Sequence, residues 1–187
     1  MKRFSNVVGF DDAPFARDQK GLVAVVGAVY AGLRFDGVLM GEIQRDGADA
    51  ADVLSVMILQ SRFAGHIRLI MLQGIALGGF NVVDVFALRQ QTGLPVLVVS
   101  RVRPDMGTIE KSLVSSVPGG KEKWAVIERL GPMEEVADVF VQRVDLSMEQ
   151  ARQVIKRFAV HSRIPEPIRT AHLIAGALTN GQSRGDP

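Results

Sequence analysis

The chain has 187 residues, of which 47% are hydrophobic, and its 22 Lys and Arg residues against 20 Asp and Glu residues give a net charge of +2 at neutral pH. This length supports one sizeable core and is short for two ordinary domains. The balanced charge neither requires nor excludes a nucleic-acid partner. The absence of cysteine excludes disulfides and thiolate metal sites.

Targeting signals are not evident in the sequence. The longest apolar runs fall short of the roughly 18 residues that cross a membrane, and no apolar stretch of signal-peptide length follows the basic start. We therefore expect a cytoplasmic protein with no membrane partner. A single domain over residues 1–180 and a flexible tail over residues 181–187 are the expected organisation.

The first third of the chain predicts strands followed by a helix. Apolar runs over residues 6–10, 22–30 and 38–43 give three strands, with Asp36-Gly37 as the turn between the second and third. Apolar residues then recur at helical spacing from residue 53 to 64. Either Asp49 or Asp52 can cap this helix, which we expect to stop near Gly65.

The central region alternates strand and helix. Residues 67–72 and 95–100 are apolar runs that predict buried strands, and residues 80–92 between them predict a helix closed by Gly93. Strand, helix and strand in this rhythm imply a right-handed parallel crossover. Ligands in such folds bind near the carboxyl ends of the strands.

The last part of the chain predicts further strands and helices. Residues 103–108 are expected to open a helix, and residues 124–129 and 139–144 are expected to be strands. Ser147 and Gln150 form a capping-box pattern before another helix. The final helix is expected to follow Pro167 and to end near residue 180, with Pro165 and Glu166 at its entry.

Three strands followed by helix, strand, helix and strand are the order of a ribonuclease-H-like α/β fold, a mixed sheet flanked by helices. Asp11 follows the first strand, Asp52 opens the first helix and Gln73 ends the fourth strand. Side chains at these places meet at one edge of such a sheet, where oxygen ligands can bind a hard cation such as Mg²⁺.

Each of these residues also has an ordinary explanation. Asp11 and Asp12 can form a turn or a cap, and Asp52 can serve only to cap its helix. His172 can be a helical histidine with an unremarkable hydrogen bond.

Two further features bear on phosphate binding. The glycine-rich run over residues 73–81 lies between a strand and a helix, but it contains neither a dinucleotide fingerprint nor a P-loop motif, and tight turns explain its glycines equally well. Arg101 and Arg103 follow a buried strand and project from its carboxyl end. Each of these arginines can contact a phosphate or form a surface ion pair.

Taken together, these motifs resemble endonuclease V. The matching positions are Asp11 in a Gly-x-Asp strand, Asp52, Gln73-Gly74, Arg101, and the segment from Arg163 to His172 with its Pro-Glu-Pro-x-Arg core. The runs over residues 73–84 and 164–169 are similar to an archaeal family of uncharacterised proteins regarded as distant relatives of endonuclease V. The chain is identified as a member of that family.

The resemblance implies a set of roles. Asp11, Asp52 and His172 would be catalytic, and the same three residues with Gln73 would hold Mg²⁺ or Mn²⁺. Arg101, Arg103 and Arg169 would contact DNA or RNA. Endonuclease V has aspartate at the position of Gln73, so a two-cation site would lose one negative charge and one ligand here.

A second departure concerns substrate recognition. Residues 42–45 read Glu-Ile-Gln-Arg where endonuclease V has a Pro-Tyr-Ile-Pro wedge that probes the altered base. Specificity for a deaminated base is therefore not carried over from endonuclease V.

The sequence supports two main readings of function. The first is an endonuclease-V-like protein that binds nucleic acid and hydrolyses phosphodiesters with a divalent metal, a metal-dependent hydrolase acting on ester bonds. The second is a non-catalytic module that holds nucleic acid or a protein on the same fold, and the sequence leaves the choice open. A small-molecule enzyme using the glycine-rich turn ranks below both.

Overall fold

A central mixed sheet organises the chain in this computed structural model, which describes residues 4–16 and 18–183. Within these residues a seven-stranded sheet has the order β3-β2-β1-β4-β7-β9-β8, and a short hairpin forms a second sheet. The main sheet consists of β1 (Asn6–Asp12), β2 (Leu22–Ala31), β3 (Arg34–Gln44), β4 (Leu69–Gln73), β7 (Val96–Ser100), β8 (Glu134–Val136) and β9 (Val139–Val144). The hairpin consists of β5 (Ala76–Leu77) and β6 (Asn81–Val82).

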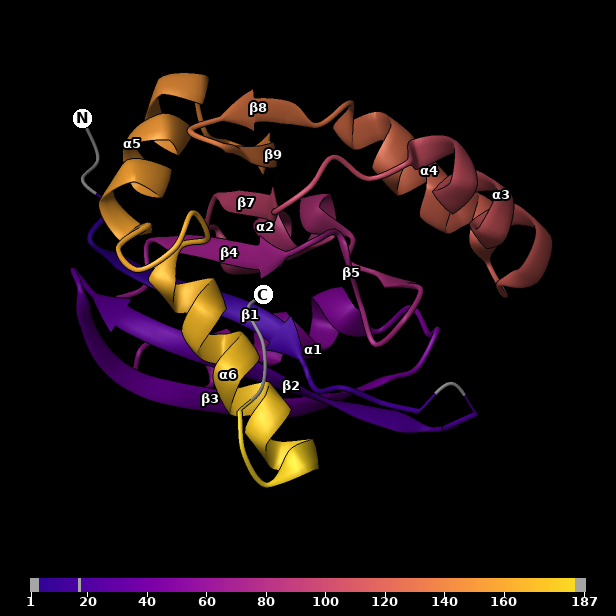
Figure 1. Ribbon diagram of the computed structural model, residues 1–187, viewed down its shortest axis with the longest axis horizontal. Helices are drawn as coiled ribbons and strands as arrows, with labels where there is room; N and C mark the ends of the chain where they lie inside the picture. Colours follow the sequence, from indigo (N-terminus) through magenta and orange to yellow (C-terminus); the bar gives the residue numbers. More distant parts are fainter. Residues whose placement is uncertain (1–3, 17, 184–187) are drawn as a thin grey trace.

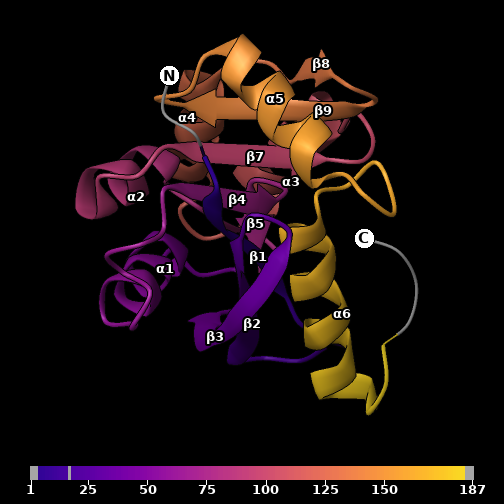
Figure 2. The same ribbon diagram turned by 90° about the vertical axis from the view of Figure 1, so that its left-hand side faces the viewer.

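Six helices accompany the sheet in the described ranges. They are α1 (Ala50–Leu59), α2 (Val85–Thr92), α3 (Met106–Ser116), α4 (Gly120–Leu130), α5 (Met148–Phe158) and α6 (Glu166–Asn180). Figures 1 and 2 show α1 and α2 on one face of the sheet and α5 and α6 on the other. The helices α3 and α4 form an arm that extends beyond the sheet (Figure 1). None of the described helices is both long and apolar enough to cross a membrane.

The strand directions bring chemically important positions to one edge. β1, β4 and β7 are parallel, whereas β2 and β9 pair antiparallel to β1 and β7. The predicted parallel crossover is therefore confirmed, and the carboxyl ends of β1, β4 and β7 lie at the same edge of the sheet.

Alternation along β1 decides which side chains meet which helices. Val7 belongs to the core cluster that includes Ile168 and Ala171 of α6, whereas Phe10 belongs to the cluster that includes Leu54 of α1. Because successive side chains of a strand point to opposite faces, Asp11 faces α6, and Asp12 faces the side of the sheet that α1 covers.

Glycine at position 9 allows α6 to pack closely on β1. A Cβ atom at Gly9 would lie 2.4 Å from the carbonyl carbon of Pro167 and 2.5 Å from the amide nitrogen of Ile168. These neighbours are backbone atoms of the first turn of α6, so they cannot turn aside. The packing distance between β1 and α6 therefore depends on the absence of a side chain at Gly9. The position of the site at the ends of these two elements depends on it as well.

Besides the end of α1, which lies at Leu59 and not near Gly65, three details of the sequence prediction are wrong. The turn between β2 and β3 lies at Gly32-Leu33, and Asp36-Gly37 lies inside β3 beside a bulge. The predicted strand over residues 124–129 lies within the helix α4, where Ile127 packs with Leu113 of α3. A short apolar run does not by itself distinguish a strand from a buried helix.

The helix predicted to start at residue 80 is the third wrong detail, because it starts at Val85. Asp84 accepts hydrogen bonds from the amides of Phe86 and Ala87 and caps α2 there. The predicted entry of the last helix is confirmed, since Pro165 is its N-cap and Glu166 its first residue. In the predicted tail, Gly181 caps α6 and the Ser183 hydroxyl donates to the carbonyl of Leu173, while residues 184–187 lie outside the described residues.

Candidate metal and nucleic-acid site

A buried carboxylate and a histidine from distant parts of the chain meet at the carboxyl end of β1. Asp11 is only 5% exposed, and its Oδ2 atom lies 2.7 Å from Nδ1 of His172 in α6. Its Oδ1 atom accepts a hydrogen bond from the amide of Asp12. The carboxylate therefore fixes the orientation of the imidazole ring.

Gln73 lies beside this pair. The parallel register pairs Phe10 with Leu72, and one further residue along each strand places Gln73 next to Asp11 on the face covered by α6. The Oε1 atom of Gln73 is buried, and within the described residues it accepts no hydrogen bond. A buried acceptor without a donor is uncommon in folded proteins and calls for a partner.

Asp52 occupies a different environment. Its Oδ1 atom accepts a hydrogen bond of 2.6 Å from Nε2 of Gln91, so the side chain links α1 to α2. Across residues 4–16 and 18–183, no three His, Cys, Asp or Glu side chains gather as a metal-binding group. Asp11 and His172 thus come together, and Asp52 does not complete a group of three with them.

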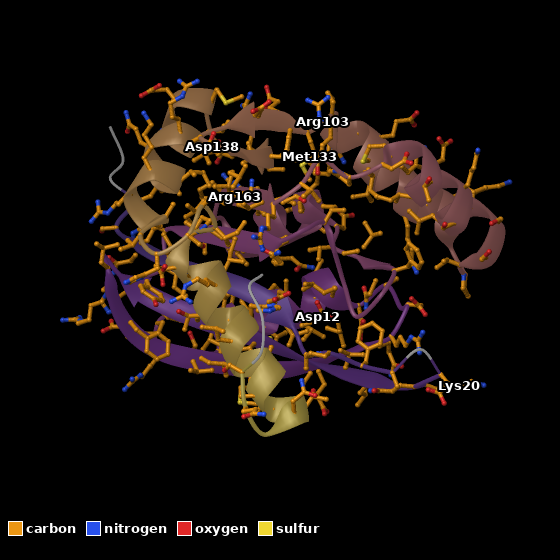
Figure 3. All side chains as sticks on the ribbon, in the orientation of Figure 1. Asp12, Lys20, Arg103, Met133, Asp138 and Arg163 are labelled. Carbon is orange, nitrogen blue, oxygen red and sulfur yellow. The ribbon has the colours of Figure 1, made fainter. Side chains whose placement is uncertain are left out.

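The predicted arginines lie in three different environments. Arg101 is exposed just beyond β7, and the Arg103 guanidinium lies 5.3 Å from the centre of the Phe140 ring. Arg169 donates from Nε to both carboxylate oxygens of Glu166. Figure 3 shows Arg103 on the loop after β7, with Asp12 lower down at the end of β1.

The same view shows a further arginine. Arg163 lies on the loop that leads into α6 (Figure 3). It belongs to the segment that the sequence singled out, although no role was predicted for it there.

Sequence reasoning missed the role of Asp12. Its Oδ2 atom accepts a hydrogen bond from the amide of Gly78, which fastens the turn of the β5–β6 hairpin to β1. Burial, together with the negative charge of Asp11, raises the pKa of Asp12 to about 6. The sequence signal was the Asp-Asp pair itself, of which only one member was expected to matter.

A second missed carboxylate holds the same turn. Asp46 follows β3 and accepts a hydrogen bond of 2.8 Å from the amide of Phe80. The buried amine of Lys123 donates to the backbone carbonyl of Asp46, and burial lowers the pKa of that amine. The Asp46-Gly47 dipeptide after a predicted strand was the available signal, but its position in the fold was not evident from the sequence.

A small, mostly apolar pocket is lined in part by Gly74, the residue that follows Gln73. Its volume is about 190 Å³, and its lining comes from the strand ends, the β5–β6 segment and the helical arm. The lining residues include Gly74, Ile75, Ser100, Met106, Ile127 and Gln142. Gly74 has a φ of +72°, a backbone conformation that favours glycine.

Comparison with known proteins places this chain in a family. The family model described as Endonuclease dU matches residues 3–179. A UPF0215 protein of Deinococcus radiodurans is 50% identical over 183 residues, which cover 98% of this chain and 93% of that protein. UPF0215 relatives also occur in archaea such as Methanosarcina barkeri, so the family predicted from the sequence extends to bacteria.

Solved structures agree with this family and with the predicted fold. A protein of unknown function from Archaeoglobus fulgidus superposes with a TM-score of 0.85 and 34% identity, covering 92% of this chain and 97% of that one. Endonuclease V of Ciona intestinalis, in complex with an inosine-containing DNA, has a TM-score of 0.56 and 15% identity, covering 89% of this chain and 82% of that one. The ribonuclease-H-like α/β fold is thereby confirmed, and the chain belongs to the Endonuclease dU family of UPF0215 proteins, which shares its fold with endonuclease V.

Proposed function

We propose that the chain is a metal-dependent endonuclease that hydrolyses phosphodiesters at Asp11, Gln73 and His172. The observation that carries this proposal is the buried Oε1 atom of Gln73, which has no donor among the described residues and lies beside the buried carboxylate of Asp11. An acceptor oxygen next to a carboxylate suits a hard divalent cation, which prefers oxygen ligands.

The residues present fit one cation better than two. Asp11 would supply one charged oxygen and Gln73 one neutral oxygen to Mg²⁺ or Mn²⁺. When bound, such a cation supplies positive charge for the phosphate oxygens and makes water a better nucleophile. Because the amide carries no charge, we expect weak binding of the metal.

His172 is the group suited to move a proton. Asp11 engages its Nδ1 atom at 2.7 Å and orients the ring, and the imidazole exchanges a proton with water or with the leaving oxygen. An imidazole can accept a proton in one step and donate it in another, which suits the group to general acid or base work. Arg101, Arg103 and Arg169 are assigned to phosphate contacts, which hold a strand in register without reading its bases.

The substrate class follows from the family description and from the pocket. The description Endonuclease dU names deoxyuridine, and the related fold of Ciona endonuclease V binds DNA that contains inosine. The pocket of about 190 Å³ opens next to Gly74 and is lined mainly by apolar side chains, as expected for a pocket that receives a base swung out of its stack. We therefore propose deoxyuridine-containing DNA as the first substrate to test.

The test is a cleavage assay with end-labelled DNA. Single- and double-stranded oligonucleotides with one deoxyuridine, one inosine or neither are incubated with the purified protein and Mn²⁺, Mg²⁺ or EDTA. We expect metal-dependent cleavage near deoxyuridine that is absent in Asp11→Ala, which controls for contaminating nucleases. Equal cleavage by the wild-type and Asp11→Ala proteins, or none by either, would overturn the proposal.

A binding module that does not cut is the second candidate. The amide of Gln73 and the lack of a three-residue group of metal ligands in the described part of the chain favour it. In that case the protein binds the same oligonucleotides with equal affinity in EDTA and in Mn²⁺, and no product forms.

A further inference from the structure

The first turn of α6 buries a carboxylate that makes its contacts within a few residues. Glu166 is 6% exposed and lies between Pro165 and Pro167, which hold the backbone of the turn. Its Oε1 atom lies 3.2 Å from both the amide nitrogen and Nδ1 of His161. Arg169 donates from Nε to both carboxylate oxygens at 3.2 Å. A buried carboxylate requires such donors, because burying it unpaired is costly.

Arg169 uses only part of its hydrogen-bonding capacity in this contact. Within residues 4–16 and 18–183, its only hydrogen bonds from the side chain are those from Nε, and neither Nη1 nor Nη2 has a protein partner. The side chain is 25% exposed. With Nε held by Glu166, the two terminal nitrogens still present the planar fork that binds two oxygens of a phosphate or carboxylate.

The position of Arg169 on α6 makes it a neighbour of the histidine in the site. Thr170 bonds to the Tyr30 hydroxyl and therefore marks the flank of α6 that faces β2. A helix turns by about 100° per residue, which places Arg169 and His172 about 60° apart on the flank away from Thr170. Residues three apart on a helix are neighbours, so Arg169 lies next to the His172 that contacts Asp11.

We propose that Glu166 is a positioning residue, which fixes Arg169 so that its terminal nitrogens bind a backbone phosphate of the nucleic acid beside the Asp11–His172 pair. The nature of the ligand rests on the proposed function. The hold of the Glu166 carboxylate on the Nε atom of Arg169, called the clamp below, rests on the contacts described above. Arginine has many rotamers, and holding it at Nε lowers the entropy lost when its fork closes on a phosphate.

The chain contains a matched control for this pair. Glu149 and Arg152 in α5 form an ion pair of 3.0 Å with the same spacing of three residues, but their side chains are 62% and 45% exposed. A surface pair of this kind contributes little to stability or to orientation. Glu149→Gln therefore removes the same charge as Glu166→Gln without removing a clamp.

The test measures binding of a fluorescein-labelled single-stranded DNA in EDTA, so that no cleavage intervenes. Removing a negative charge should tighten DNA binding if only bulk electrostatics matter. The clamp predicts the reverse: Glu166→Gln should weaken binding about fivefold, while Glu149→Gln leaves it unchanged or tighter. Arg169→Gln should weaken binding about tenfold and lower the slope of log affinity against log salt by about 0.7, the contribution of one phosphate contact.

A double-mutant cycle shows whether Glu166 acts through Arg169. Glu166→Gln should have no further effect in the Arg169→Gln background, and Arg169→Lys should lose most of the affinity despite keeping its charge. In NMR, the Nε–H proton of Arg169 should be protected from exchange with water in the wild type and should exchange fast in Glu166→Gln. Arg169→Lys keeps the proposal testable even if Glu166→Gln does not fold.

The outcomes separate this inference from the proposed function. If the wild type binds DNA and Arg169→Gln changes neither affinity nor salt slope, the proposed function stands and the inference is overturned. Additive effects of the two variants, or tighter binding by Glu166→Gln, also overturn it. If the wild type binds no DNA under any condition, the proposed function fails and the assigned ligand fails with it.

Discussion

Oδ2 of Asp11 and Nδ1 of His172 lie 2.7 Å apart although 161 residues separate them in the chain. Packing of α6 against β1 creates this contact, and Gly9 permits that packing. The pair is mostly buried, with side-chain exposures of 7% and 27% for the aspartate and the histidine. Its chemistry therefore depends directly on how two elements from the two ends of the chain fit together.

Substitution of either member of this pair should separate binding of metal from transfer of a proton. We expect Asp11→Asn to abolish both Mn²⁺ binding, measured by calorimetry, and cleavage. We expect His172→Ala to reduce cleavage by about 10²–10⁴-fold, the usual contribution of a general acid or base, while Mn²⁺ affinity changes less. Equal loss of Mn²⁺ affinity in both variants would make His172 a ligand.

Gln73→Asp should strengthen the metal site at some cost to the metal-free protein. A second carboxylate beside Asp11 attracts a divalent ion better than an amide, and without the ion the two like charges repel. We expect higher Mn²⁺ affinity in calorimetry and, in EDTA, a free energy of unfolding lower by about 1 kcal/mol or more. Asp11→Ala in the same background should abolish the gain in affinity. An unchanged Mn²⁺ affinity would show that position 73 is outside any cation site.

Asp52→Asn tests whether the first helix contributes a metal ligand. Because the Asp52 carboxylate bonds to Gln91 of α2, we expect this variant to bind Mn²⁺ with the affinity of the wild type. Calorimetry alongside Asp11→Asn provides the comparison. A loss as large as that of Asp11→Asn would instead assign Asp52 to the metal site.

The raised pKa of Asp12 predicts a pH-dependent penalty on stability. Burial, with the charge of Asp11, raises this pKa from 3.8 to about 6, so between these values the folded state holds a proton that the unfolded state releases. Stability therefore falls as pH rises from about 4 to about 6, and the cost is full above that range. Asp12→Asn keeps an acceptor for the Gly78 amide and removes this titration.

The size of the effect can be measured by denaturant unfolding in EDTA. The gap between the two pKa values corresponds to about 3 kcal/mol, and partial exposure of the side chain reduces the expected gain of Asp12→Asn at pH 8 to about 1–2 kcal/mol. This gain, relative to the wild type, should be absent at pH 4. A gain that is the same at both pH values would contradict the assignment.

Gly9→Ala should damage the site through the fold. The new methyl group would meet backbone atoms of Pro167 and Ile168 at 2.4–2.6 Å, so α6 has to shift away from β1. Overpacking of this kind costs about 1–3 kcal/mol, and the shift should lengthen the Asp11–His172 contact and reduce cleavage. Gly65→Ala is the matched control, because a Cβ at that position meets no atom within 4 Å. Equal stability of the two variants would refute this account of the packing.

The sequence by itself determined most of the elements and their order. Continuous apolar runs located the strands of the sheet's centre, which are buried on both faces, and helical spacing located the amphipathic helix after Ser147, which buries one face. The Pro165-Glu166-Pro167 entry of α6 was equally readable, since proline restricts the backbone at a helix start. Local signals failed where the apolar run was short, as in α4, which contains the segment predicted to be a strand.

Only the tertiary structure decided which polar groups share a site. Chain order placed Asp11, Gln73 and Asp52 near one edge, but it did not give the rotation of α1, which turns Asp52 toward Gln91. It also gave no sign that Asp12 and Asp46 hold the same turn, or that Glu166 holds Arg169 at Nε. Side-chain contacts between distant segments depend on packing angles and on close approaches such as that at Gly9, and no local pattern encodes these.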